Sequence, residues 1–164
     1  MVCQWMERDS ALGEIRASLV HASLREGRMG DVADDVTVDD LMTGLIATCA
    51  MRGLSTLSLR GDRFFEAIEA SYRELERLAP DAGLDVRFTV LLDRVYRDSP
   101  VVREAVSTAV QRNLISLDNP EYEDMRIKFS RDEAARLLED LPGDARVYNR
   151  IADAYLEHRP VPVV

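Results

Sequence analysis

The sequence predicts a mainly α (α+β) fold, in which a helical domain carries one small β-hairpin. Three observations lead to this class. Apolar residues recur at three- and four-residue spacing through most of the chain, as in amphipathic helices. Residues 114–129 instead hold two short runs separated by an acidic turn, as in a β-hairpin. With 164 residues, 46% of them hydrophobic, the chain is long and apolar enough for one continuous core.

Two helices are predicted in the N-terminal third. Residues 10–26 carry an apolar stripe, and residues 38–52 carry a stronger one that ends before Gly53. Thr37 and Asp40 have the spacing of a capping box at the start of the second helix. Because this helix is the most apolar of the chain, we expect it in the core.

The remaining segments are predicted from their start and stop signals. Helices are expected over residues 62–80, 100–113, 131–141 and 144–158, and strands over residues 54–59, 114–117 and 125–129. Pro80 should end the first of these helices. Ser99 and Pro100 form a cap and first-turn pair, and Ser130 with Glu133 forms a second capping box.

Residues 84–96 fit two different periods. Every second residue from 84 to 92 is apolar, as in a strand, whereas Phe88, Leu91, Leu92, Val95 and Tyr96 lie on one face of a helix. We favour the helix, because its stripe extends to Tyr96 and buries Leu91. A strand would instead make residues 54–92 a β-α-β unit and move the fold towards α/β.

The charge of the chain is acidic, with a net charge of −9 spread over its whole length. Proteins that bind nucleic acid through phosphate contacts usually have a basic surface, which this composition lacks. The longest uncharged stretch, residues 41–51, is far shorter than the roughly 20 residues of a membrane span. No basic region precedes an apolar one at the N-terminus, so we expect a cytoplasmic protein with reduced Cys3 and Cys49.

The sequence shows no pattern typical of catalysis, metal binding or phosphate binding. The two histidines, His21 and His158, and the two cysteines lie far apart, without the paired spacing of a zinc site. No Gly-rich loop leads into a Lys-Ser or Lys-Thr pair. We therefore expect a non-enzymatic protein with no catalytic residue, no metal, no cofactor and no small-molecule substrate.

The order of elements over residues 62–130, three helices followed by a hairpin, resembles a winged helix-turn-helix. The resemblance is one of element order and implies that the last helix enters the major groove while the hairpin touches the DNA backbone. The residues that would contact DNA or another partner are Arg103, Ser107, Thr108, Gln111, Arg112, Arg126, Lys128 and Arg131. The wing departs from this pattern, because its turn holds Glu121, Glu123 and Asp124 where a DNA-binding wing would carry basic residues.

These acidic residues, together with Asp31, Asp34 and Asp35, form a candidate docking surface for a basic protein. Our leading hypothesis is a regulatory or adaptor protein that acts through protein–protein contacts, either with another protein or by self-association. The alternatives are a winged-helix DNA-binding regulator and an acidic inhibitor or antitoxin of a basic partner. The expected organisation is an N-terminal helical segment (1–53) that packs on the rest or dimerises, a winged-helix-like domain (54–158) and a frayed tail (159–164).

Overall fold

The computed structural model describes residues 33–117 and 123–159, which form one compact unit of five helices and two small sheets. The class is therefore α+β and mainly helical, as the sequence predicts. The helix expected over residues 10–26 lies outside the described residues. Within the described ranges, no helix is long and apolar enough to cross a membrane.

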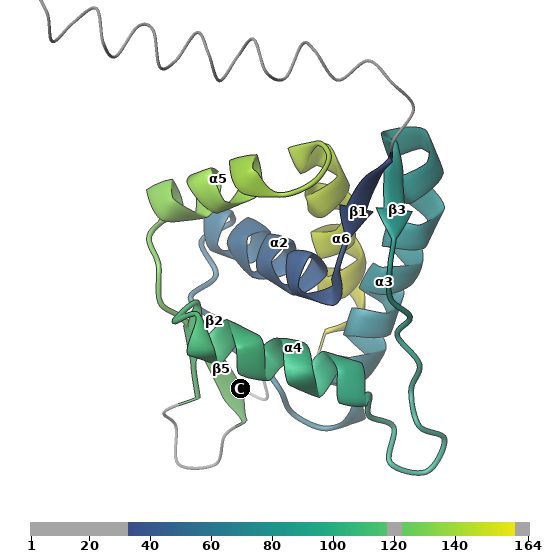
Figure 1. The fold of residues 1–164 in the computed structure, drawn as a ribbon. Helices are drawn as coiled ribbons and strands as arrows, with labels where there is room; N and C mark the ends of the chain where they lie inside the picture. The colour runs from purple at the N-terminus through teal and green to yellow at the C-terminus, as the bar shows by residue number, and fades with distance from the viewer. Residues whose placement is uncertain (1–32, 118–122, 160–164) are drawn as a thin grey trace, which may run out of the picture. The chain divides into compact units, whose positions relative to one another are not determined.

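Helix α2, Val38–Met51, lies at the centre of the unit, in contact with α4, α5 and α6 (Figure 1). Nine consecutive residues, from Leu41 to Cys49, are buried, which is typical of a helix that is covered on all sides. The predicted capping box starts it: the backbone N–H of Thr37 donates to Oδ2 of Asp40 over 2.8 Å, and the N–H of Asp40 donates back to Oγ1 of Thr37 over 3.3 Å. The prediction that this helix lies in the core is confirmed.

Two long helices, packed against each other, form another part of the core. Helix α3, Asp62–Ala82, packs along α6, Ala145–His158. The hydroxyl of Ser71 on α3 donates to the carbonyl of Ile151 on α6 over 3.2 Å. Helix α3 continues past Pro80, where the sequence predicts its end, and stops at Gly83, which has a φ of 66°. Pro80 lies in the last turn, so the backbone hydrogen bond that it removes is lost only where the helix is ending.

Helices α4, Pro100–Gln111, and α5, Arg131–Asp140, cover α2 from two sides (Figure 1). The predicted capping box of Ser130 and Glu133 starts α5. Ser99 occupies the N-cap position of α4 as predicted, but its side chain accepts no capping hydrogen bond. Val110 on α4 is 38% exposed, whereas Val102, Ala105 and Ala109 of the same helix are buried.

The predicted hairpin is present and is part of a three-stranded antiparallel sheet. Strands β4, Ile115–Ser116, and β5, Asp124–Ile127, pair with each other, and β2, Thr56–Ser58, pairs with the other edge of β5. The register places Leu57 opposite Met125 and Ile115 opposite Ile127. The strands are shorter than the alternating patterns in the sequence.

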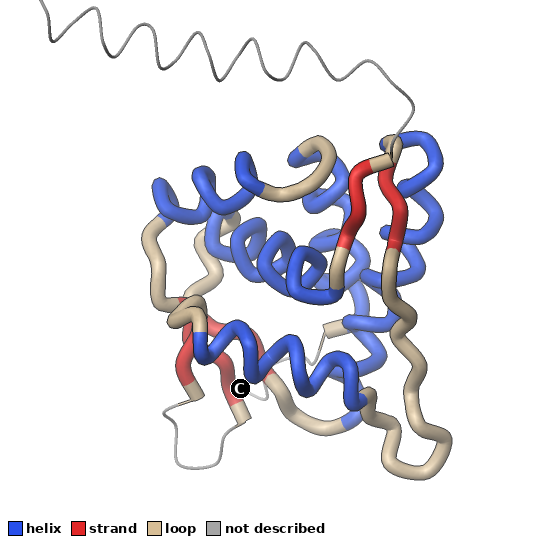
Figure 2. The backbone as a smooth tube through the Cα atoms, in the orientation of Figure 1, coloured by secondary structure: helices blue, strands red, loops and turns tan. Residues whose placement is uncertain are grey.

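The helix predicted over residues 84–96 is wrong. Strand β3, Leu84–Val86, pairs in parallel with β1, Asp34–Val36, and the chain then continues as a connection without helix or strand as far as α4 (Figure 2). The parallel pairing with β1 holds this segment extended. The strand alternative also differs in one respect, because β3 pairs with β1 and not with residues 54–59.

Candidate functional site

Three large apolar side chains are exposed on the connection between β3 and α4. Leu91 is 72% exposed, Val95 79% and Tyr96 77%. Among the described residues, the one other exposed large apolar side chain is Val110 on α4, and it is only 38% exposed. Single exposed apolar residues are common on protein surfaces, but three within six residues form a patch, which is typical of a contact site. We call Leu91, Val95 and Tyr96 the apolar tip.

The apolar tip is held by a turn built around Asp93. Its Oδ1 accepts hydrogen bonds from the backbone N–H groups of Val95 and Tyr96, each over 2.8 Å. The N–H of Tyr96 first, and that of Val95 second, hold the pKa of Asp93 below its ordinary value of 3.8. The backbone N–H of Arg97 donates to the carbonyl of Asp93, and that of Asp93 to the carbonyl of Asp98. The carboxylate is therefore engaged in shaping the loop.

The end of the connection that follows β3 is anchored on the helical core. Val90 is buried, and the ring of Phe88 lies 5.3 Å from that of Tyr72 on α3. The hydroxyl of Tyr72 donates to the carbonyl of Phe88 over 3.2 Å. Burial, and then the hydrogen bond to Glu76, raise the pKa of this hydroxyl, so it stays protonated as a donor. Long ordered loops in compact domains usually have a binding role, because folding alone does not need them.

Ion pairs fix the last residues of the connection. Arg97, which has a φ of 53°, pairs with Glu66 on α3 over 2.5 Å. Asp98 pairs with Arg103 in the first turn of α4. Arg94 is exposed and has no ion pair with any described residue. Within the described part of the chain, the loop that carries the apolar tip therefore holds one positive charge without an ion pair.

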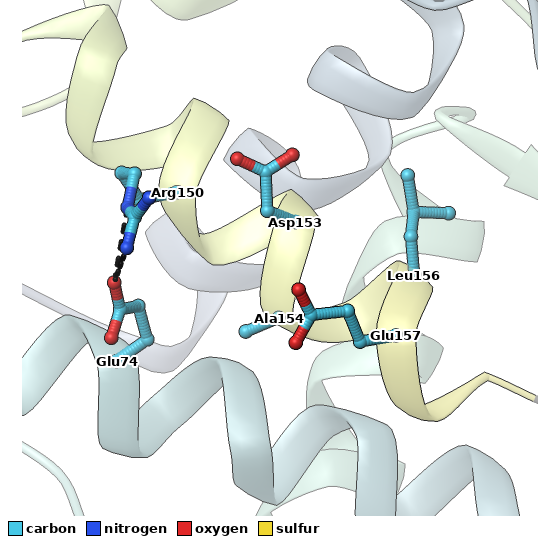
Figure 3. Close-up of a pocket in the computed structure, with 6 residues that line it drawn as sticks. All are labelled: Glu74, Arg150, Asp153, Ala154, Leu156 and Glu157. Atoms are coloured by element: carbon cyan, nitrogen blue, oxygen red, sulfur yellow. Dashed lines mark hydrogen bonds and ion pairs between the residues drawn. The ribbon is translucent and has the colours of Figure 1, made fainter.

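A shallow open groove runs between α3 and α6 beside this connection. Its lining residues are Glu66, Glu69, Ala70, Arg73, Glu74, Arg77, Arg97, Ala154, Glu157 and His158. Figure 3 shows a neighbouring hollow, where Arg150 reaches across to Glu74 and Glu157 projects from α6. We call the space between α3 and α6 the α3–α6 groove.

Most charged groups of the α3–α6 groove are paired within the chain. Glu69 pairs with Arg73 over 2.8 Å, and Glu74 pairs with Arg77 over 2.7 Å. The hydrogen bond from Arg77 is the largest of the effects that lower the pKa of Glu74, which keeps this carboxylate ionised. The charged side chains of the α3–α6 groove thus form a surface ion-pair network.

The contact residues predicted on α4 are mostly exposed, but several are engaged within the chain. Arg103 pairs with Asp98, and the hydroxyl of Ser107 donates to the carbonyl of Arg103 over 3.1 Å. Arg112 turns towards α2, where its Nη1 donates to Oγ1 of Thr43 over 3.4 Å. Thr108 is half-buried, and Gln111 is exposed. The outward face of α4 thus offers less charge than the sequence suggests.

The basic residues predicted on the hairpin are Arg126, Lys128 and Arg131, and all three are exposed. Arg126, on β5, lies opposite Ser116 and Thr56 and also has an interaction within the chain. The backbone N–H of Lys128 donates to the carbonyl of Leu114, which places Lys128 near the C-terminal end of α4. The structure therefore brings the hairpin and the end of α4 together.

The acidic residues proposed for docking do not form one surface within the described part of the chain. Asp34 and Asp35 are on β1, whereas Glu123 and Asp124 are at the start of β5 in the other sheet. Asp35 pairs with Arg87 and Glu123 with Arg60, while Asp34 and Asp124 also have interactions within the chain. Asp31 and Glu121 lie outside the described residues.

The sequence did contain a signal for the apolar tip that the helical interpretation concealed. The side chain of Asp93 accepts hydrogen bonds from the backbone N–H groups two and three residues later in the chain, and aspartate commonly forms turns of this kind. In the extended alternative, Leu91 falls on the outward side of the alternation.

Neither a metal site nor a reactive thiol is found among the described residues. No group of three or more His, Cys, Asp or Glu side chains there could hold a metal ion. Cys49 is buried in α2, and burial raises the pKa of its thiol to about 11, so it is protonated at neutral pH. No protein-family model, curated protein or solved structure matches this chain.

Proposed function

We propose that this chain is a non-enzymatic regulatory or adaptor protein that acts through protein–protein contacts, and that the apolar tip is a contact surface. The observation that carries the proposal is the exposure of Leu91, Val95 and Tyr96 on a loop fixed by its own hydrogen bonds. Contact between apolar side chains and water is unfavourable, and a protein partner would remove this contact by burying the three side chains.

The hydrogen-bonded conformation of the tip favours binding. A loop that is already ordered loses less conformational entropy when it docks. Tyrosine is also enriched among the residues that contribute most to protein interfaces, because its ring is large and stiff while its hydroxyl can still bond. Tyr96 is therefore the expected anchor of the contact.

A photo-crosslinking amino acid at position 96 tests the proposal in cells that produce the full chain. The matched control carries the same amino acid at position 136, because Arg136 is also exposed but lies on α5, which packs against α2 and α6. We expect a protein adduct from position 96 that is absent at position 136 and that Leu91→Ser diminishes. Equal labelling at the two positions, or no protein adduct at position 96, would contradict the proposal.

A winged-helix DNA-binding regulator is the second candidate. The observation that favours it is the strand order β2-β5-β4, in which the strand between α2 and α3 pairs with the hairpin that follows α4. Two features weigh against it. A helix-turn-helix joins its helices by a turn of about 3–4 residues, whereas residues 83–99 separate α3 from α4. In addition, Arg103 on α4 and Arg112 at its C-cap are engaged within the chain.

Fluorescence anisotropy with a randomised DNA duplex separates the two candidates. A DNA-binding regulator would bind the duplex at low salt, and at physiological salt a subset of the DNA sequences would stay bound. The double variant Gln111→Ala/Lys128→Ala would bind the DNA more weakly. A protein-contact module would show no DNA binding at physiological salt, and Tyr96→Ser would leave the low-salt signal unchanged.

A further inference from the structure

We infer that the apolar tip of one molecule packs into the α3–α6 groove of a second copy of this chain, forming a symmetric dimer. The inference rests on the proposed function, because it identifies the protein that covers the tip. Three properties of the described residues lead to it: the position of the groove, its small residues, and the charges that the chain leaves unpaired.

The projecting and receiving surfaces lie next to each other. Arg97 lines the groove and directly follows Tyr96 in the chain. A two-fold symmetric contact requires one surface that is complementary to itself, so that each molecule both gives and receives. A tip beside a groove meets this requirement, because rotating one copy by half a turn can set each tip into the opposite groove.

Small side chains occur in the groove where a ring would have to enter. Ala70 on α3 and Ala154 on α6 line it and are both half-buried. Alanines leave room between the two helices, while the long side chains of Arg73 and Arg77 can cover an inserted ring with their methylene groups. An aromatic side chain such as Tyr96 suits this combination of a small-residue floor and aliphatic walls.

The unpaired charges on the two surfaces have opposite signs. On the connection, Asp98 and Arg97 are ion-paired, which leaves Arg94 without an ion pair in the described part of the chain. In the groove, Glu66, Glu69 and Glu74 are paired, which leaves Glu157 without one in the same part. Arg94 of one copy and Glu157 of the other would therefore pair twice in the symmetric dimer.

Sedimentation equilibrium of the full chain over a concentration series tests the dimer. We expect a Kd on the order of 10 µM, because small contacts bind weakly. Tyr96→Ser on the tip and Ala154→Arg in the groove should each raise the Kd about 100-fold, since the symmetric contact loses a roughly 10-fold contribution twice. The control, Val110→Ser, removes an exposed apolar side chain of α4 and should leave the Kd unchanged.

A charge exchange tests the orientation of the two copies. Arg94→Glu and Glu157→Arg should each weaken the dimer, because each places two like charges together. The double variant should restore the wild-type Kd to within about 3-fold, as expected when a pair is reversed. Circular dichroism of every variant shows whether its helices are intact, and Leu91→Ser provides a second tip variant if one of the others does not fold.

Two results would overturn the inference. One is a chain that stays monomeric up to about 1 mM, the range of a negligible contact. The other is a dimer that neither Tyr96→Ser nor Ala154→Arg weakens.

If position 96 crosslinks only to a different protein while the purified chain is monomeric, the self-association is wrong and the proposed protein-contact function stands. If position 96 gives no adduct, both are wrong.

Discussion

Gly44→Ala is expected to destabilise this protein, although alanine usually stabilises a helix. Gly44 is buried in α2, and the ring of Tyr148 from α6 packs against it. A Cβ atom added at Gly44 would lie 2.0 Å from Cδ1 of Tyr148 and 2.5 Å from its Cε1. Carbon atoms in contact are about 3.5–4.0 Å apart, so the ring would have to move by roughly 1.5 Å.

The ring of Tyr148 cannot make this move without cost. It is fully buried, and its hydroxyl donates a hydrogen bond of 2.8 Å to the carbonyl of Pro142. Overpacking costs about 1–3 kcal/mol, and a broken hydrogen bond of a buried group about 1–3 kcal/mol. Alanine is about 1 kcal/mol more favourable than glycine within a helix, which offsets part of this cost. The free energy of unfolding should therefore fall by about 3 kcal/mol, the middle of the combined range.

A double-mutant cycle, measured by urea unfolding, isolates this contact. In a Tyr148→Ala background the clash is absent, so Gly44→Ala should become stabilising by up to about 1 kcal/mol. In a Tyr148→Phe background the ring remains, so Gly44→Ala should still destabilise. A Gly44→Ala variant that is as stable as the wild type would refute the close packing of α2 against α6.

The helix caps, the buried thiol of Cys49 and the Asp93 turn each lead to a prediction of their own. Thr37→Ala should lower the free energy of unfolding by about 1 kcal/mol in urea denaturation, because it removes a capping hydrogen bond. Ser99→Ala should change this free energy by less than about 0.5 kcal/mol, because the buried hydroxyl of Ser99 has no hydrogen-bond partner among the described residues. In a Cys3→Ser background, a thiol reagent at neutral pH should modify Cys49 only as fast as the protein opens, as the raised pKa and burial require, and should react at once in urea. Asp93→Ala should speed hydrogen exchange at the amides of Val95 and Tyr96 several-fold, and Asp93→Asn, which keeps an accepting oxygen, should speed it less. Because the pKa of Asp93 is lowered in the folded loop, the charge-dependent part of this ordering is present at neutral pH and is lost as the pH falls below 3.8 towards the folded value.

The helices could be predicted from the sequence because their signals are local. Thr37 with Asp40 and Ser130 with Glu133 form the predicted capping boxes, and each starts a helix at the predicted residue. The hairpin was also predictable, because its alternating runs and its turn lie close together in the chain. The end of α3 was missed by a few residues, because a proline in the last turn removes only one hydrogen bond of a helix that Gly83 then closes.

The pairing of β1 with β3 could not be predicted, because it joins residues about fifty positions apart with no local signal. Asp34 and Asp35 give no sign of a strand in the sequence, since charged residues are rare in buried parallel strands. The structure accommodates them because both are exposed, and Asp35 is paired with Arg87, which directly follows β3. This pairing, with the anchoring of Phe88, favours the extended chain over the helical stripe of residues 84–96.

Two separate local causes expose the apolar tip. Val86, Phe88 and Val90 continue inward on the two-residue period that begins at β3, which leaves Leu91 on the outward side. Val95 and Tyr96 are exposed for a different reason, because the Asp93 turn binds their backbone N–H groups and directs their side chains away from the core. Both causes act on the main chain or on neighbouring residues, so replacing the side chain of Leu91 or Tyr96 should leave the loop conformation intact. A loss of association in Leu91→Ser or Tyr96→Ser therefore reports on the contact surface itself, which is the condition that the test of the dimer requires.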